Sequence, residues 1–422
     1  MTTYTRLIVT SLCFACASTL VMLLGSLGGC ATSVPPTSPE KLPPVTTGVP
    51  VEVKPTPTPT PPMASQEPPA PVFRQVTWDA LPGWREDNIA EAWSAFAAGC
   101  SALATRDVWR DVCATSSRLS NPSAEAVRLF FESNFVPYQV SSQTSGEEGL
   151  ITGYYEPLLR GSRKQTPRYR YPVYGVPEDL VVVDLGELYP ELKNMRLRGR
   201  IEGRRLVPYY DRARIEGGEA PLRGKEIVWV DDAVELFFLH VQGSGRILLD
   251  SGETLRVGYA DQNGYPYRSI GRVLVDRGEL SPEQVSMQSI QAWARRNPTK
   301  AVELLNSNAS YVFFRELPAS TAGPPGSLGV PLTARRSVAI DPRYVPLGAP
   351  VFIAATWPNS PKPLNRLVLA QDTGGAIRGP VRADLFWGYG EAAAREAGRM
   401  KQRLRMWMLW PRNQPLPAVT SD

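Results

Sequence analysis

Apolar residues recur at three- and four-residue spacing along residues 88–135, just after a long proline-rich stretch. This spacing places apolar side chains on one face of a helix, and it predicts helices within 86–104 and 121–135. Asn121 and Pro122 are the expected N-cap and first helical residue of the second helix, because proline loses no intrahelical hydrogen bond there. The folded part of the chain is therefore expected to begin with helices.

The helical spacing returns in two later segments. One covers residues 281–296, where Ser281 and Pro282 are expected to open the helix. The other crosses residues 391–403. These two segments are separated by runs of a different kind.

Short runs rich in Val, Ile, Tyr and Phe occupy most of the chain from residue 149 onward, and Gly, Pro or Asn interrupts them. Runs of this length and composition predict β-strands of a barrel or sandwich, so a mostly β fold is expected. The runs are 149–157, 171–177, 180–185, 226–232, 237–249, 254–260, 330–341, 350–355, 364–372 and 405–411.

The N-terminus has the layout of a secretion signal. A single basic residue, Arg6, precedes an apolar run that ends in the sequence LGGC at Cys30. Small residues before a cysteine resemble the lipobox of bacterial lipoproteins, which predicts a signal peptide over 1–29 and lipid on Cys30. By the same resemblance, Ala31 favours the outer membrane, on its periplasmic face. A plain transmembrane helix and cleavage at another position are the alternatives.

Residues 30–71 are dominated by proline, threonine and serine. Such a segment cannot build a core and favours extended polyproline II conformers, so it is expected to act as a tether. At ~3 Å per residue it would reach roughly 100 Å. This reach suits a partner that lies away from the membrane.

The overall composition excludes some classes of protein. A chain of 422 residues is long enough for two domains with their own cores. Its formal net charge is +5, or +4 once Arg6 leaves with the signal, which gives no support for a nucleic-acid partner. Without the signal and Cys30, the remaining cysteines are Cys100 and Cys113, and the sequence leaves open whether they form a disulfide or stay as free thiols.

The chain has one histidine, His240, which is expected to be structural. No residues at metal-ligand spacing accompany it, so neither a metal nor a cofactor is expected. The glycines of the run 240–247 lack the spacing of a nucleotide loop and could serve a strand bend. In a functional alternative, Gln242 and Ser244 would approach a polar ligand closely.

Two aspartates, Asp372 and Asp384, lie in the apolar run 371–390. A carboxylate removed from water is costly, so such a position indicates either a paired structural acid or a functional one. A calcium or magnesium site is a weaker alternative, because the loops lack dense oxygen ligands. Nearby tyrosines in the runs 153–157 and 257–271 could stack on sugar faces, although the same residues are common in β cores.

These runs together resemble the membrane-bound lytic transglycosylase A family of peptidoglycan-cleaving outer-membrane lipoproteins. The resemblance extends over about 72–411, and its last third is similar to the 3D module, named for three aspartates, here Asp341, Asp372 and Asp384. The segments that carry it are 153–157, 241–247, 258–271, 310–314, 326–348 and 371–390.

The resemblance implies two domains. A double-psi β-barrel with N-terminal helices would be built from 80–157 and 326–412, and a smaller, β-rich, barrel-like domain would be inserted over 158–325. A groove for a glycan strand would run between the two domains.

The resemblance also implies the chemistry, with the glycan strand of peptidoglycan as substrate. The bond from N-acetylmuramic acid to N-acetylglucosamine would be cleaved without water, leaving 1,6-anhydromuramic acid, and wall-synthesis proteins are possible partners. Asp384 would act as acid and then base. Asp341 is expected to be structural. The residues expected to support catalysis or bind substrate are Asp372, Tyr154, Tyr155, Gln242, Ser244 and Tyr259.

The sequence leaves three points open: the pKa of Asp384, the orientation of the Arg382 side chain, and the type of function. The apolar neighbours of Asp384 should raise its pKa, but Arg382 would share its strand face and favour the ionised form. Arg382 is therefore expected to point away from Asp384 or to contact substrate. A hydrolase that uses both Asp372 and Asp384 with water, and a wall-binding protein without activity, are the alternative functions.

Overall fold

The structure is a computed structural model, and its description begins at residue 71. The predicted signal peptide and Cys30 lie outside the described residues, as does the tether except for Pro71, which begins β1 (Pro71–Gln75). No helix within the described ranges is long and apolar enough to cross a membrane. Those ranges are 71–143, 146–189, 192, 195, 197–320 and 322–417.

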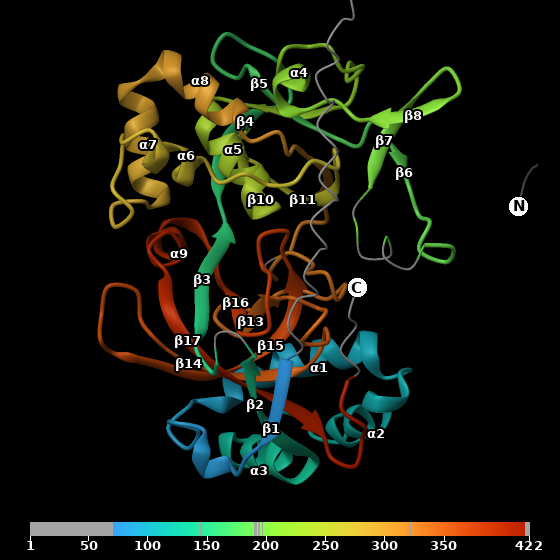
Figure 1. The fold of residues 1–422 in the computed structure, drawn as a ribbon, viewed down its shortest axis with the longest axis vertical. Helices are drawn as coiled ribbons and strands as arrows, with labels where there is room; N and C mark the ends of the chain where they lie inside the picture. The colour runs from blue at the N-terminus through green and yellow to red at the C-terminus, as the bar shows by residue number, and fades with distance from the viewer. Residues whose placement is uncertain are drawn as a thin grey trace, which may run out of the picture. The chain divides into compact units, whose positions relative to one another are not determined.

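Six strands form a closed barrel in the order β17-β14-β15-β13-β16-β3, and β3 pairs again with β17. Two of its pairs are parallel, β13 with β15 and β16 with β3, and β2 and β1 extend the sheet beyond β17 (Figure 1). This barrel is the predicted double-psi β-barrel. Its strands are β3 (Gly149–Glu156), β13 (Ser337–Ile340), β14 (Pro350–Thr356), β15 (Pro363–Thr373), β16 (Arg382–Tyr389) and β17 (Lys401–Pro411), with β2 at Phe135–Ser142.

Helices before β2 close one side of the barrel core, as predicted from the spacing of apolar residues. Phe96 of α1 packs against Phe130 and Phe131 of α3 at ring-centroid distances of 5.4 and 5.3 Å. These aromatic side chains belong to the same core cluster as the inward-facing residues of the barrel. The elements are α1 (Trp93–Leu103), α2 (Asp107–Ser116), α3 (Ala124–Asn134) and two short 3₁₀ helices, Trp78–Ala80 and Ile89–Ala92.

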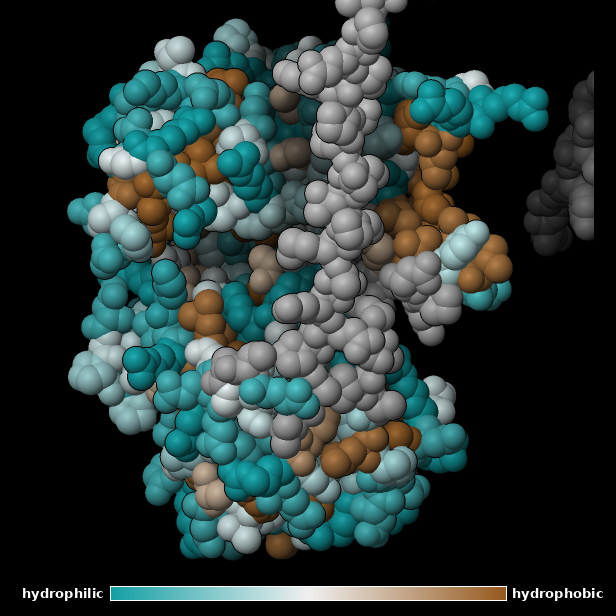
Figure 2. All heavy atoms as spheres, viewed as in Figure 1, coloured by the Kyte–Doolittle hydropathy of each residue, from teal (hydrophilic) through white to brown (hydrophobic). Residues whose placement is uncertain are grey.

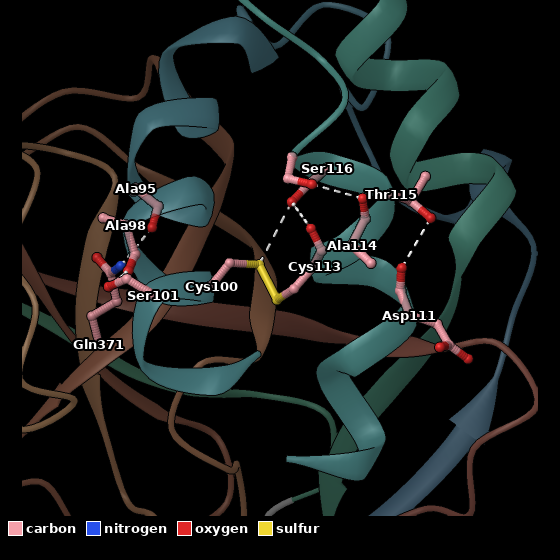
Figure 3. Close-up of a disulfide and its surroundings, with 11 residues drawn as sticks. Ala95, Ala98, Cys100, Ser101, Asp111, Cys113, Ala114, Thr115, Ser116 and Gln371 are labelled. Atoms are coloured by element: carbon pink, nitrogen blue, oxygen red, sulfur yellow. Dashed lines mark hydrogen bonds between the residues drawn. A yellow bond between two sulfur atoms is a disulfide. The ribbon is translucent and has the colours of Figure 1, made fainter. Parts of the chain in front are cut away.

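A disulfide joins α1 to α2 through Cys100 and Cys113, whose Cα atoms are 5.4 Å apart (Figure 3). Of the two alternatives that the sequence left open, the structure shows the disulfide. Close to Cys100, Gln371 Nε2 donates to the carbonyl oxygen of Ala95 in α1 at 2.7 Å, and Gln371 Oε1 accepts from Ser337 Oγ at 2.6 Å. Gln371, which precedes Asp372 in β15, is thus fixed to helix α1.

Between β3 and β13 the chain builds a second sheet in the order β12-β11-β10-β4-β9-β5. A bridge between Gly175 and Phe314 brings its two edge strands together, which gives the barrel-like form that was predicted. The strands are β4 (Leu158–Ser162), β5 (Tyr171–Tyr174), β9 (Glu226–Val230), β10 (Ser244–Leu249), β11 (Thr254–Gln262) and β12 (Val312–Leu317).

Helices and a small third sheet complete this part of the chain. The third sheet exposes Val182, Ile201 and Leu206, and hydrophobic side chains gather over it in Figure 2. Its strands are β6 (Val181–Val182), β7 (Arg198–Glu202) and β8 (Arg205–Pro208). The helices are α4 (Arg212–Glu216), α5 (Ala233–Gln242), α6 (Ile270–Asp276), α7 (Met287–Arg296) and α8 (Pro298–Asn306).

The strand predicted over 237–249 is wrong in its first half, where the structure has α5. Asp232 caps this helix by accepting from the backbone N–H groups of Val234 and Glu235 at 2.7 and 3.1 Å. Gly243, with φ +77°, ends the helix in the left-handed conformation, and β10 follows. The five consecutive residues 236–240 are all buried, so the helix shows no amphipathic pattern that a sequence could reveal.

Three predicted helix boundaries are also wrong. Asn121 adopts a positive φ of 45° and cannot serve as an N-cap, so Ser123 caps α3 instead. Ser286 opens α7 through a capping box with Ser289, five residues after the predicted start. The helix expected over 391–403 is α9 (Gly390–Ala397), and the chain turns at Gly398 before β17.

Candidate functional site

Both aspartates of the run 371–390 lie on strands that flank β13 in the barrel. Ala339 of β13 pairs with Asp384 of β16 on one side and with Asp372 of β15 on the other. Asp384 also pairs with Thr152 of β3. Because neighbouring strands lie ~4.8 Å apart, the Cα atoms of the two aspartates are separated by roughly 10 Å across the sheet. The barrel therefore sets the two carboxylates at a fixed spacing.

Asp384 has a single hydrogen-bond donor within the described part of the chain. Thr152 Oγ1 donates to Asp384 Oδ1 at 2.6 Å. Burial raises the pKa of Asp384 to about 6, although the Thr152 hydrogen bond and the charge of Arg382 lower it. The negative charge of Asp372 adds to the rise. A carboxyl in this state can hold a proton near neutral pH and release it.

Asp372 is surrounded by donors on both of its oxygens. Ser327 donates its backbone N–H and its hydroxyl to Asp372 Oδ1 at 3.0 and 2.9 Å, and the backbone N–H of Thr373 donates to the same atom at 2.9 Å. The hydroxyl of Tyr154 donates to Oδ2 at 2.9 Å. Burial raises the pKa of Asp372, and these four hydrogen bonds oppose the rise.

The two aspartates open into one cleft of about 550 Å³. Its walls come from the barrel, through Arg382 and the loops at 324–332 and 372–377, and from the segment between β3 and β13, through the end of α5 and parts of β10, β11 and β12. Several glycines line the cleft, among them Gly243 and the exposed Gly375. A polar ligand can therefore approach main-chain groups closely.

The structure brings most of the predicted site residues to this cleft. Ser244 begins β10 and Tyr259 lies on β11, and both line the cleft with Tyr154. Gln242, the last residue of α5, also lines it and ties the helix to β3, because its Oε1 accepts from the backbone N–H of Tyr155 at 2.9 Å.

Tyr155 is the predicted site residue that the structure does not place in this cleft. Since successive residues of a strand face opposite sides, Tyr155 points away from the face that carries Tyr154. Its side chain lines a separate cavity of about 760 Å³, and its hydroxyl contacts Met287 Sδ at 3.4 Å. A direct contact between Tyr155 and a ligand of the cleft is therefore not supported.

Asp341 is buried beside the barrel and does not line the cleft. Its carboxylate accepts from Arg343 Nη2 at 2.7 Å and from the backbone N–H of Gly379 at 2.8 Å. The second bond holds the loop that leads into β16. These contacts support the structural role expected for Asp341.

His240 lies in α5 and not in the strand predicted over 237–249, and its ring is buried. Arg212 Nη1 lies 3.0 Å from His240 Nδ1, and the ring of Tyr311 packs against the imidazole with centroids 4.3 Å apart. Burial, with the charge of Arg212, lowers the pKa of His240 well below its ordinary value. The histidine is therefore neutral, which suits a structural role.

Sequence reasoning missed Thr152 and misplaced Arg382. Arg382 Nη2 donates to Thr152 Oγ1 at 2.9 Å, so the guanidinium lies beside Asp384 and does not point away from it. The alternative expectation, that Arg382 contacts substrate, stays a prediction. The alternation of side chains within the run 149–157 could have identified Thr152, because it shares a strand face with Tyr154. No cluster of metal-ligating side chains occurs among the residues that the structure describes.

Comparisons with known proteins place these features in context. Two family descriptions match the chain: an MltA specific insert domain over residues 150–315 and a 3D domain over residues 336–410. A curated relative is the membrane-bound lytic murein transglycosylase A of Vibrio cholerae serotype O1. It is 32% identical over 278 residues, which span 64% of this chain and 67% of that protein.

Solved structures agree with these matches. MltA from Neisseria gonorrhoeae, in a monoclinic form, is 41% identical, with a TM-score of 0.72 over 83% of this chain and 95% of that one. Escherichia coli MltA with bound chitohexaose is 25% identical, with a TM-score of 0.59 over 82% of this chain and 95% of that one.

Proposed function

This chain belongs to the membrane-bound lytic murein transglycosylase A family, and from that membership we propose that it is a lytic transglycosylase of peptidoglycan. It cleaves the β-1,4 bond between N-acetylmuramic acid and N-acetylglucosamine and leaves a 1,6-anhydromuramic acid end. The observation that carries the chemistry is one half-buried carboxyl with a raised pKa, Asp384, which lies in the cleft and has a single hydrogen-bond donor among the described residues.

The proposed mechanism needs only that one acid. Protonated Asp384 donates its proton to the glycosidic oxygen as the bond to the muramic anomeric carbon breaks. The resulting carboxylate then removes the proton of the muramic C6 hydroxyl, whose oxygen attacks the same anomeric carbon and closes the anhydro ring. Asp384 ends the cycle protonated, and no water is consumed.

Asp372 is proposed to support the site without reacting. Its four hydrogen bonds reach both carboxyl oxygens, three of them at Oδ1, so the protein fixes this carboxylate more firmly than Asp384. A two-carboxylate hydrolase would require the second acid to activate water or to form a covalent bond. The surroundings of Asp372 therefore favour the transglycosylase over the hydrolase.

The cleft suits an extended glycan. Tyr259 and Tyr267 both line it and are partly exposed, so their rings can stack on sugar faces. The E. coli relative holds chitohexaose, an oligosaccharide, which supports a glycan ligand for this chain. We propose that the glycan lies between a barrel domain of 80–157 and 326–412 and an inserted domain of 158–325, because the strands change sheets close to these limits.

We propose that lipid on Cys30 holds the protein at the outer membrane, on its periplasmic face, and that residues 30–71 tether it. The LGGC sequence and the proline-rich composition support this arrangement, as does the name of the relative from V. cholerae, which describes that protein as membrane-bound. The tether would let the cleft reach the wall, where wall-synthesis proteins are proposed partners.

The test is a digestion of purified peptidoglycan, with products separated and weighed by mass spectrometry. Wild-type protein is compared with Asp384→Asn and Asp372→Asn. Anhydro products, lighter than hydrolytic products by two hydrogens and an oxygen, are expected from the wild type and should disappear with Asp384→Asn. Both substitutions keep the size of the side chain, so folding is checked by circular dichroism.

Two other results would replace this proposal. Products with reducing ends that are lost in both variants would identify a two-carboxylate hydrolase. Glycan binding without any cleavage, unchanged in Asp384→Asn, would identify a wall-binding protein.

A further inference from the structure

We propose that Arg382 is a positioning residue for Asp384 and acts through the hydroxyl group of Thr152. The inference rests on the proposed function, because it concerns the acid that the transglycosylase mechanism uses. Arg382 and Thr152 are contributed by the parallel strands β16 and β3, and both line the same cleft as Asp384.

The direction of the hydrogen bonds follows from the chemistry of the groups. A guanidinium can only donate, so Thr152 Oγ1 must accept from Arg382 Nη2 across the 2.9 Å contact. The single hydroxyl hydrogen of Thr152 is then directed to Asp384 Oδ1 at 2.6 Å, a distance typical of a hydroxyl bonded to a carboxylate. Without Arg382, the hydroxyl could turn and accept a hydrogen bond from a protonated Asp384.

The direction of the hydrogen bond from Thr152 to Asp384 decides which carboxyl oxygen carries the catalytic proton. Because Oδ1 always accepts from Thr152, the proton that Asp384 gives and takes back belongs on Oδ2. The described residues supply no donor to Oδ2, so this oxygen is available to the glycosidic oxygen. Arg382 therefore selects one of two otherwise equivalent carboxyl oxygens.

Arg382 is itself held in place. Its Nη1 atom donates to the carbonyl oxygen of Leu150 at 3.4 Å and to that of Ala383, so the side chain lies against the β16 and β3 backbones. No carboxylate in the described ranges forms an ion pair with Arg382, and Asp384 is the charged group that acts on its guanidinium. That charge acts on Asp384, where it opposes the rise in pKa caused by burial.

The electrostatic effect has a definite sign. Removing the positive charge of Arg382 favours the protonated form of Asp384, so its pKa rises further. Of the other charged groups described in the cleft, Asp372 acts on the pKa of Asp384, and it acts in the opposite direction to Arg382. The remaining titratable or charged groups that line the cleft are Arg315, His240, Tyr154, Tyr259 and Tyr267.

The experiment measures the pKa of Asp384 and the kinetics of cleavage in the same purified full-length proteins, held in detergent. The carboxyl carbon of Asp384 is followed by ¹³C NMR against pH and assigned by its loss in Asp384→Asn. Arg382→Gln is expected to raise this pKa by roughly one unit and to lower kcat at least tenfold, with little change in KM. Arg382→Lys keeps the charge and one donor, and it should recover part of both effects.

Thr152 variants test the hydroxyl itself. Thr152→Val removes the hydroxyl at nearly constant volume and should also raise the pKa of Asp384 and lower kcat. Thr152→Ser keeps the hydroxyl, so the pKa of Asp384 and kcat should stay close to their wild-type values. In the double variant Thr152→Val/Arg382→Gln, the two losses in kcat should not add, because both substitutions break one chain of hydrogen bonds.

Arg403→Gln is a matched control. Arg403 of β17 and Arg382 of β16 both pair with Leu150 of β3, but the side chain of Arg403 is exposed and faces Glu148. This variant should leave the pKa of Asp384 and the kinetics unchanged.

Two outcomes would overturn the proposal. An unchanged Asp384 pKa in both Arg382→Gln and Thr152→Val would show that no positioning chain exists. A rise in KM alone, with kcat and its pH profile unchanged, would make Arg382 a substrate-binding residue. Because the NMR titration needs no substrate, it still tests the positioning role if the wild-type protein forms no anhydro products.

Discussion

The ends of β15 and β16 each present one carboxylate to the same cleft, and the two surroundings differ in their hydrogen-bond donors. Asp372 receives four hydrogen bonds, two from backbone N–H groups and two from hydroxyls. Asp384 receives one, from Thr152. Both side chains are half-buried and desolvation raises both pKa values, so burial alone does not distinguish a reactive acid from a supporting one. The number of hydrogen-bond donors around each carboxylate distinguishes the two roles.

The largest expected effect separates the two aspartates by activity. Asp384→Asn should lower kcat about 10³-fold or more, because the amide can neither give nor take the proton. Asp372→Asn should lower kcat only about tenfold, since the amide oxygen can still accept from Ser327 and Thr373. Anhydro product formation, followed by mass spectrometry, measures both. Equal losses in the two variants would remove the distinction.

A second comparison uses stability. Asp372→Ala leaves the N–H groups of Ser327 and Thr373 without their acceptor, and it should lower the free energy of unfolding by about 2–4 kcal/mol. Asp384→Ala should lower it by less than about 1 kcal/mol or raise it, because a desolvated carboxylate is removed. Urea unfolding at pH 7 measures both variants. A larger loss from Asp384→Ala would contradict the assigned roles.

The stability of the protein should also depend on pH through Asp384, in the direction expected for an acid that folding keeps protonated. Its folded pKa of about 6 lies above its ordinary value of 3.8, so folding favours the protonated form. The contribution of Asp384 to stability is therefore fully present below about pH 4 and is lost as the pH rises through about 6. Between these limits, the wild type should lose stability relative to Asp384→Asn, which chemical denaturation over this pH range can measure.

The pH profile of activity gives a smaller effect. Cleavage requires protonated Asp384, so kcat/KM should fall as the pH rises through about 6. In Asp372→Asn the nearby negative charge is absent, and this descending limb should move to lower pH by less than one unit. A limb that stays in place would mean that Asp372 and Asp384 do not interact electrostatically.

Tyr154→Phe should have the smallest effect. It removes one of the four donors to Asp372 while the ring still packs against Phe386, whose centroid lies 5.2 Å away. Stability should fall by about 1 kcal/mol and kcat by no more than a few-fold. A loss of activity as large as that of Asp384→Asn would place Tyr154 in the reaction itself.

Much of the architecture could be predicted from the sequence because its signals are local. Apolar spacing of three and four residues predicted the N-terminal helices, and short β-branched and aromatic runs predicted a mostly β chain. The same reading failed at α5, where residues 236–240 are all buried and give no helical periodicity. It also misplaced the starts of α3 and α7, because several nearby serines and asparagines are equally suited to cap a helix.

The sequence by itself determined that two carboxylates lie in an apolar run, and its motifs pointed to the family and to Asp384. Only the tertiary structure decided which hydrogen-bond donors surround each carboxylate. Three of the four donors to Asp372 come from Tyr154 and Ser327, which are 218 and 45 residues away along the chain, and the donor to Asp384 comes from Thr152, 232 residues away. Strand register creates these contacts, and register depends on the closure of the whole barrel and not on the local sequence.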